Sequence, residues 1–345
     1  MPLSSLPTGA PSAPTRRSVL RGLAALPLTA SLAASLTACV GSPAAHLAAA
    51  GPAPGTPEAD GLHVVTSRRL VGNGQASPFF DARRAPELTY ARASFRRPDG
   101  TVAGRLGALV SSEAALERVD PYSGDAVERL AEVLRGRDSL FFVHGYNQTF
   151  EAAARDLAQL SAGIGFSGHK VLFSWPSKGG LLDYGYDRES ALLARDHLAE
   201  ALYAVLGDAE GRRVYLVAHS MGTLVTLEAL RAYRDRYGET GLERVGSIVF
   251  AAPDIDVDMF KAGLMRLGPL RRKLMVITAT NDRALDLSSR LAGGQRVGAL
   301  SSTELVGLGV RVVDATEFAS GLTRHDAFVS NADVRAVIQR AIERG

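Results

Sequence analysis

The chain has 345 residues, in which 39 lysines and arginines stand against 36 aspartates and glutamates. Arg16, Arg17 and Arg21 account for the whole net charge of +3, so the rest of the chain has no basic excess that would indicate nucleic-acid binding. Cys39 is the only cysteine, which excludes an intramolecular disulfide bond and a metal site built from several thiolates.

The first 38 residues have the pattern of an export signal. Two adjacent arginines, Arg16 and Arg17, precede a weakly apolar stretch over residues 22–38 that contains Pro27. This stretch is shorter than the roughly 20 apolar residues that span a bilayer. An apolar segment of this kind favours secretion, and the paired arginines indicate the Tat route for folded proteins.

The leader ends in Leu36-Thr-Ala-Cys39, which resembles a bacterial lipobox. The resemblance implies that Cys39 is lipidated and anchors the protein to a membrane. Val40 is not the aspartate associated with inner-membrane retention, so we expect the periplasmic face of the cell envelope, at the outer membrane. The alternatives are an unmodified cysteine beside an ordinary cleavage site and a cytoplasmic protein whose N-terminus only imitates a signal.

Composition divides the chain into three parts. Residues 1–38 are the predicted signal, and residues 39–60, which are rich in alanine, proline and glycine, are the predicted flexible tether. Residues 61–345 are numerous enough for one large domain with a substantial core.

Short apolar runs alternate with helical patterns from residue 61 onward. We expect strands at residues 62–67, 88–95, 139–143, 170–174, 214–218, 246–251, 274–278 and 310–313. We expect helices at residues 150–162, 187–206, 223–237 and 326–342. The first two strands are typical of an antiparallel pair, whereas the later alternation predicts a mostly parallel sheet with helices on both faces. The expected fold class is therefore α/β.

The turn around Ser220 is the most informative segment. An apolar strand ends at Ala218 and a helical pattern begins at Thr223, so Ser220 would stand on a sharp turn. The motif Ala218-His-Ser-Met-Gly222 departs from Gly-x-Ser-x-Gly at its first position, but alanine is also small. We interpret Ser220 as a nucleophile, and because serine is a weak one, this interpretation requires a base elsewhere in the chain.

A second loop, His144-Gly-Tyr-Asn147, directly follows the apolar run at residues 139–143. Glycine lets the backbone bend so that an N–H group points into a site, and two such groups would stabilise the oxyanion of a tetrahedral intermediate. We assign these donors to the amides of Tyr146 and Met221. The alternative is a tight structural turn in which His144 hydrogen-bonds the loop.

Two aspartates, Asp254 and Asp282, lie just beyond predicted strand ends. Either could orient a histidine and stabilise its protonated form, and helix capping is the alternative role for both. We favour Asp282 as the acid, because it lies one strand further along the chain, and Asp254 remains the alternative.

His325 is the best placed of the seven histidines to act as the base, because it lies between the last predicted strand and the closing helix. Its alternative role is that of a capping or surface histidine. The order Ser220, Asp282, His325 is the chain order of the α/β hydrolases.

Five segments carry a family resemblance: Phe142-Val-His-Gly-Tyr-Asn-Gln-Thr-Phe150, Phe173-Ser-Trp-Pro-Ser177, Ala218-His-Ser-Met-Gly222, Ala251-Ala-Pro-Asp254 and Asn281-Asp-Arg-Ala-Leu285. Through them the chain resembles the α/β-hydrolase superfamily, and within it a bacterial subfamily catalogued as hydrolase-like domains of unknown function. The resemblance covers about residues 61–345. It implies the α/β-hydrolase fold and the triad, and it does not specify a substrate.

Several aromatic residues are candidates for the substrate pocket. Trp175 ends a predicted strand, Tyr184 and Tyr186 follow in the next loop, and His144 lies in the oxyanion loop. The tyrosine loop could equally be packing for the long helix behind it. The amphipathic stretch at residues 259–267 is expected to be a connecting helix, with a small lid as the alternative.

Together these features predict a serine hydrolase that cleaves carboxylic esters through an acyl-enzyme, with no metal or organic cofactor. Its expected partners are a small-molecule or lipid ester and, through Cys39, a membrane. Thioesters and amides are cleaved by the same apparatus. The competing hypothesis is a catalytically inactive lipoprotein that keeps the fold and acts as a binding or structural protein of the envelope.

Overall fold

The computed structural model describes residues 61–72, 76–95, 116–207, 212–318 and 325–345. The predicted signal, Cys39 and the predicted tether lie outside the described residues. Within the described ranges, no helix combines the length and the apolar character that crossing a membrane requires.

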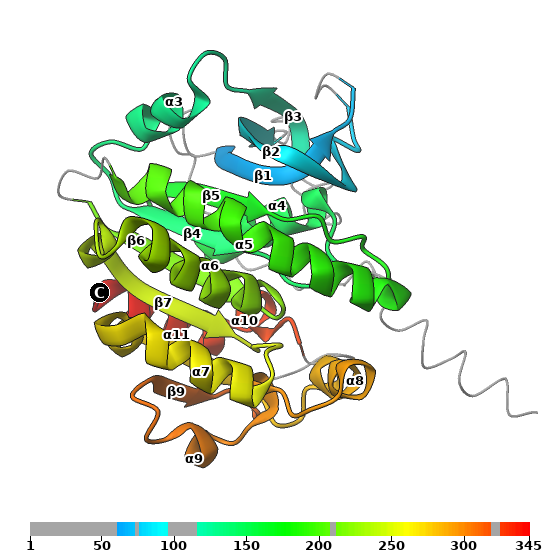
Figure 1. The fold of residues 1–345 in the computed structure, drawn as a ribbon, viewed down its shortest axis with the longest axis vertical. Coiled ribbons are helices and arrows are strands. Elements are labelled where there is room, and N and C mark those ends of the chain that lie inside the picture. The colour runs from blue at the N-terminus through cyan, green and yellow to red at the C-terminus, as the bar shows by residue number, and fades with distance from the viewer. Residues whose placement is uncertain (1–60, 73–75, 96–115, 208–211, 319–324) are drawn as a thin grey trace, which may run out of the picture. The chain divides into compact units, whose positions relative to one another are not determined.

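The described chain forms a sheet of nine strands in the order β3-β2-β1-β5-β4-β6-β7-β8-β9 (Figure 1). β1, β2 and β3 pair antiparallel, and all pairs from β1–β5 through β8–β9 are parallel. The strands are β1 (Gly61–Leu70), β2 (Phe80–Phe95), β3 (Leu116–Pro121), β4 (Ser139–Val143), β5 (His169–Ser174), β6 (Val214–His219), β7 (Val245–Ala251), β8 (Leu274–Thr278) and β9 (Arg311–Asp314). The predicted fold, a mostly parallel sheet with antiparallel N-terminal strands, is confirmed.

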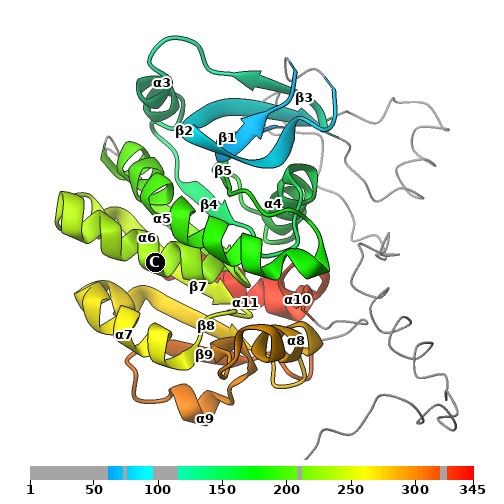
Figure 2. The same ribbon diagram turned by 45° about the vertical axis from the view of Figure 1, so that its right-hand side comes forward.

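Helices cover both faces of the sheet, as Figures 1 and 2 show. α5, α6 and α7 pack on one face, and α4, α10 and α11 pack on the other. The helices are α3 (Ala126–Val133), α4 (Phe150–Gly163), α5 (Tyr184–Gly207), α6 (Gly222–Tyr237), α7 (Val257–Leu267), α8 (Arg283–Ala292), α9 (Ser302–Leu305), α10 (Ala327–Ser330) and α11 (Ala332–Glu343). Short 3-10 turns are η3 (Leu181–Asp183), η4 (Leu242–Arg244), η5 (Gly268–Lys273) and η6 (Val297–Ala299).

The central strands are apolar throughout because both of their faces are buried. In β4, Phe141 and Val143 join the core beneath α5 and α6, whereas Leu140 and Phe142 join the core beneath α4 and α11. A strand with two buried faces shows no polar alternation, which explains the continuous apolar runs in the sequence.

The edge of the sheet departs most from the sequence prediction. The sequence does not predict β3, because Glu117, Arg118 and Asp120 interrupt its apolar pattern. β3 is an edge strand that pairs with β2 alone, and Val119 is its one buried residue. β2 also begins at Phe80, eight residues before the predicted start.

The predicted closing helix over residues 326–342 is two helices, α10 and α11. Asn331 separates them, with an extended backbone and a side chain that accepts hydrogen bonds from the amides of Asp333 and Val334. Asparagine is a preferred N-cap residue, so Asn331 ends α10 and starts α11.

α7 resolves one of the alternatives left open by the sequence. Phe260, Leu264 and Leu267 are buried in the core shared with α6. A helix whose apolar face is already packed in the core has no free face to close over a pocket. The stretch is therefore a connecting helix, as expected, and not a lid.

The parallel strands place the predicted site residues at one edge of the sheet. Val143 of β4 is in register with Phe173 of β5 and Ala218 of β6, and Ala218 is in register with Phe250 of β7. The loops after these strands therefore lie side by side at the carboxyl edge, where open α/β sheets bind their ligands.

Candidate active site

Ser220 occupies a strained turn between β6 and α6. Its φ of 52° lies in the left-handed region, which costs a residue other than glycine about 1–3 kcal/mol. The turn is held because the Ser220 amide donates to the carbonyl of Ala251 at 2.9 Å, while the Ser220 carbonyl accepts from the amides of Thr223 and Asp254. Surrounding contacts thus impose a conformation that serine does not adopt readily, as is common at functional sites.

Two glycines let neighbouring backbones cross beside Ser220. A Cβ atom on Gly222 would lie 2.3 Å from the carbonyl oxygen of His144, and one on Gly145 would lie 2.8 Å from the Cβ of Ser220. The loop after β4 therefore packs directly against the serine turn. Ala218, which stands where the usual motif has glycine, is a buried strand residue and fits its place in the sheet.

His325 and Asp282 form a close pair in the structure. Nδ1 of His325 lies 2.7 Å from Oδ2 of Asp282, whose side chain is fully buried. The other carboxylate oxygen of Asp282 accepts from the amides of Ala284 and Leu285 at the start of α8. Both roles considered for Asp282 in the sequence are thus present together, one on each oxygen.

The His325–Asp282 pair sets the protonation of the imidazole. Burial lowers the pKa of His325, but the charge and hydrogen bond of Asp282 outweigh this, so that the pKa lies above its ordinary value of 6.5. Because Nδ1 donates its proton to the carboxylate, Nε2 of the neutral ring carries the lone pair that can accept a proton.

Ser220 and His325 do not hydrogen-bond each other directly in the structure. Both residues are described, and the structure records no hydrogen bond that joins the Ser220 hydroxyl to His325. The ring of His219, next to Ser220 in the chain, lies 4.6 Å from the ring of His325, centroid to centroid. Hydrogen bonds between a serine and its base are often long in the free state and shorten when substrate binds.

Asp254, the alternative acid, has other partners. Its carboxylate lies 3.3 Å from Nε of Arg296 and accepts from the hydroxyls of Ser288, at 2.8 Å, and Tyr184, at 3.2 Å. Burial raises its pKa, while the charge of Arg296 acts in the opposite direction. Of the two aspartates, Asp282 is the one that hydrogen-bonds His325.

The amide of Met221 is available as an oxyanion donor. Within the part of the chain that the structure describes, no acceptor is recorded for this N–H group. The second assigned donor, Tyr146, lies in the loop after β4, where its hydroxyl donates to the carbonyl of Gly180 and its ring meets that of Tyr184 edge-on. Gly145 brings this loop against Ser220, so both assigned amides belong to the turns that flank the hydroxyl.

Two buried charged residues that the sequence analysis does not single out hold the loops after β4 and β5. The guanidinium of Arg68 donates to the carbonyl oxygens of Gln148 and Ser177, and the carboxylate of Asp187 accepts from the amides of Asn147 and Lys178. Arg68 follows an apolar strand and Asp187 starts a helix, as many surface residues do, so the sequence carries no signal for either role.

The prediction that His144 and Trp175 line the substrate pocket is wrong. Both side chains are fully buried, and their rings stack 5.1 Å apart at 9°. The indole N–H of Trp175 donates to the His144 carbonyl, and the Trp175 amide donates to Nε2 of His144. Burial, followed by the nearby charge of Arg68, lowers the pKa of His144 to about 3, so it is a neutral structural residue.

The two predicted pocket tyrosines are also engaged in packing. Tyr184 is mostly buried and donates to Asp254, while Tyr186 donates to the carbonyl of Ala82 with its ring near the cations of Arg84 and Lys178. The structure therefore agrees with the packing alternative for this loop.

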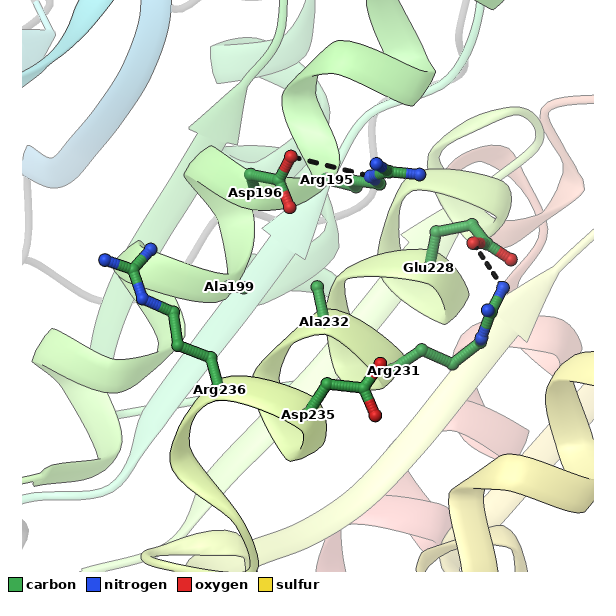
Figure 3. A pocket seen from close by; sticks show the side chains of 8 residues that line it. All are labelled: Arg195, Asp196, Ala199, Glu228, Arg231, Ala232, Asp235 and Arg236. Carbon is green, nitrogen blue, oxygen red and sulfur yellow. Dashed lines mark hydrogen bonds and ion pairs between the residues drawn. The ribbon is translucent and has the colours of Figure 1, made fainter.

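A pocket of 420 Å³ lies away from this site, between α5 and α6 (Figure 3). Its lining pairs Glu228 with Arg231 at 2.5 Å and Arg195 with Asp196 at 3.5 Å. These charges balance one another on the outer surface of the helices, and none belongs to the serine turn. Within the described residues no group of histidine, cysteine and acidic side chains could hold a metal ion.

Comparison with known proteins gives a family match and several distant structural likenesses. A family model described as "Alpha/beta hydrolase of unknown function (DUF900)" matches residues 125–342. No curated protein matches the chain in sequence.

Three solved structures illustrate the structural likenesses. An acetylxylan esterase has a TM-score of 0.36 and 12% identity over 60% of this chain and 97% of its own. A serine hydrolase without lid from Xanthomonas campestris has a TM-score of 0.36 and 14% identity over 74% and 89%. A thermostable esterase from Pseudomonas putida has a TM-score of 0.36 and 14% identity over 74% and 77%.

The backbone crossing at Gly222 generates a stability prediction. Gly222→Ala should lower the free energy of unfolding by about 1–3 kcal/mol, because its methyl group would overlap the carbonyl oxygens of His144 and Val143. Urea unfolding followed by circular dichroism measures the change. Gly185→Ala is the matched control, since a Cβ there meets nothing within 4 Å. A Gly222→Ala variant as stable as the wild type would contradict the crossing.

Proposed function

Because the chain belongs to this family of alpha/beta hydrolases of unknown function, we propose that it is a serine hydrolase that cleaves carboxylic esters. Ser220 is the nucleophile, His325 the general base and Asp282 the acid that orients His325. The observation that carries the proposal is the 2.7 Å hydrogen bond between His325 and Asp282, at the sheet edge where Ser220 stands on its strained turn.

Acylation follows from the tautomer of His325. Nε2 of the ring takes the proton of the Ser220 hydroxyl as its oxygen bonds to the ester carbonyl carbon. The carbonyl oxygen becomes an oxyanion that accepts from the amides of Met221 and Tyr146. When the tetrahedral intermediate collapses, the bond to the alcohol oxygen breaks and the imidazolium returns its proton to that oxygen.

Deacylation uses the same groups with water as the nucleophile. His325 takes a proton from water as the water oxygen attacks the acyl carbon, and then returns a proton to Ser220 as the acid leaves. The carboxylate of Asp282 stabilises the imidazolium in both halves of the reaction. Its full burial strengthens this interaction, since the local dielectric is lower than that of water.

The choice of ester among acyl compounds rests on the packing of α7. α7, the segment that could have formed a lid, packs in the core. The lack of a lid at α7 favours accessible esters over deeply enclosed substrates, whereas the triad chemistry also extends to thioesters and amides. The alternative function, an inactive binding or structural protein, needs no reactive serine.

A fluorophosphonate probe separates these two functions. We expect the folded, leader-free protein to be labelled at Ser220, because the phosphorus centre is attacked by an activated serine. Ser220→Ala should abolish labelling, and Ser247→Ala, which changes another buried serine on β7, should not. Mass spectrometry locates the adduct, and chromogenic esters of graded acyl length measure turnover. A folded wild type that is not labelled would favour the binding protein.

Paired substitutions test the identity of the acid. Asp282→Asn should lower kcat by about 10³–10⁴-fold, because the amide no longer fixes the reactive tautomer of His325. Asp254→Asn should chiefly lower the free energy of unfolding, since it leaves the buried cation of Arg296 unpaired. Ester kinetics and urea unfolding on both variants measure the two effects. Loss of turnover in a folded Asp254→Asn protein with an active Asp282→Asn protein would reverse the assignment.

The same proposal has a pH signature. The base must be neutral in the free enzyme, and its pKa is raised above 6.5, so kcat/KM should rise with pH through an inflection above 6.5. Asp282→Asn removes the charge that stabilises the imidazolium, and burial then moves the inflection of its residual activity downward. An inflection that stays in place would disconnect Asp282 from the base.

We further propose that the protein is exported by the Tat route and lipid-anchored through Cys39 on the periplasmic side, with the outer membrane favoured. The support is the leader sequence alone. In a full-length expression strain, the wild type should fractionate with membranes and shift in mobility with globomycin, and Cys39→Ala should do neither. Equal membrane association of both proteins would argue against the anchor.

A further inference from the structure

The side chain of His219 packs against His325, next to the turn that contains Ser220. It is the last residue of β6, directly before Ser220, and only 6% of it is exposed. One side of its ring stacks on Phe328 of α10, with centroids 4.3 Å apart at 26°, and it also contacts the ring of His325. Nε2 of His219 lies 3.1 Å from the main-chain carbonyl oxygen of His325.

The protonation state of His219 follows from these contacts. A ring nitrogen beside a carbonyl oxygen must donate, so Nε2 carries a proton. Burial, and then the charge of His325, lowers the pKa of His219 well below 6.5, so the ring is neutral and Nδ1 is unprotonated. Among the described residues Nδ1 has no hydrogen-bond partner. The single donor of this ring is therefore committed to His325.

We propose that His219 is a positioning residue, which fixes the backbone of His325 relative to Ser220 through its Nε2–H donor and its stacked ring. The inference rests on the proposed function, since it concerns the same triad. It assigns a role to a residue that touches neither the ester nor the proton that moves.

The geometry explains why such a residue is needed. Asp282 holds His325 at Nδ1 only, and a ring fixed at one atom can still pivot about that bond. His219 adds a second point of attachment, on the main chain of His325. His219 and Ser220 are consecutive residues. The hydrogen bond from His219 therefore connects the backbone of His325 to the residue directly before the nucleophile.

The attachment continues into the core. Phe328, against which His219 stacks, also stacks on Phe142 of β4 with centroids 5.9 Å apart. The amide of Val329 donates to the carbonyl of Asp326, which starts α10 immediately after His325. The rings of His219 and Phe142 therefore both hold the start of α10, and with it the backbone from which His325 projects.

The neutral state of the His219 ring is part of its proposed positioning role. When His325 accepts the serine proton it becomes a cation, and the groups that stabilise it are the carboxylates of Asp282, Asp254 and Asp326. A protonated His219 at 4.6 Å would oppose this charge. Burial keeps His219 uncharged, so it can hold the loop without destabilising the imidazolium.

Three substitutions separate the donor from the ring. His219→Phe keeps a stacking ring and removes the donor. His219→Gln places an amide N–H as many bonds from Cα as Nε2, and His219→Asn places it one bond short. We expect kcat to fall about 10–100-fold in the Phe and Asn variants with KM within about twofold of the wild type, and to recover in part with Gln, which returns the donor without the stacked ring.

A remote histidine provides the matched control. Nε2 of His197 on α5 also contacts a main-chain carbonyl, that of Pro86, at 3.2 Å and at an exposed position. His197→Phe should leave kcat, KM and the pH profile unchanged. Wild-type kcat in His219→Phe, a loss confined to KM, or no recovery with Gln relative to Asn would each overturn the proposal.

A second readout does not depend on turnover. The titration of the His325 ring, followed by NMR of its carbon-bound protons, should shift in His219→Phe and return toward the wild type in His219→Gln. If the wild type hydrolyses no ester and resists the fluorophosphonate, the proposed function fails, yet this titration still tests the coupling of the two histidines. If the wild type is active and the titration is the same in all variants, the positioning role alone fails.

Discussion

The close crossing of the turns after β4 and β6 is the constraint on which the site depends. At this point the backbone of residues 143–145 passes so near the serine turn that neither Gly145 nor Gly222 has room for a methyl group. The crossing places the loop after β4, which contains Tyr146, against the turn that contains Ser220 and Met221. The left-handed backbone of Ser220 costs about 1–3 kcal/mol, and the backbone hydrogen bonds with Ala251, Thr223 and Asp254 hold it in place.

Buried charges hold the backbone of the loops around this crossing. Arg68 and Asp187 satisfy backbone groups in the loops after β4 and β5, where no neighbouring strand is available to do so. Burial lowers the pKa of Arg68 to about 10, partly offset by the charge of Asp187, so the guanidinium stays protonated at neutral pH. Such buried ions cost desolvation energy, and in return they fix loop positions to which a catalytic geometry is sensitive.

The sequence correctly predicts the strands and turns that local residue patterns encode. β4 and β8 lie where their apolar runs predict, and the strained turn falls between the strand and helix that flank Ser220. Side-chain direction is not encoded locally. Trp175 and His144 follow strands at the same sheet edge, as pocket residues do, yet both side chains are buried and they hydrogen-bond each other twice. From the sequence, Arg68 and Asp187 would be predicted to lie on the surface, because the groups that they bind are distant in the chain.

The two aspartates show why distant contacts decide a role. Asp254 and Asp282 follow adjacent parallel strands and are equivalent in local sequence terms. Asp254 forms an ion pair with Arg296, 42 residues further along the chain, and its carboxylate also accepts from the hydroxyls of Ser288 and Tyr184. One carboxylate oxygen of Asp282 accepts a hydrogen bond at the N-terminus of α8, and the other oxygen binds His325. A carboxylate that already binds a cation and two hydroxyls is a weaker acceptor and counter-charge for an imidazole. The other partners of each aspartate therefore decide which one pairs with His325.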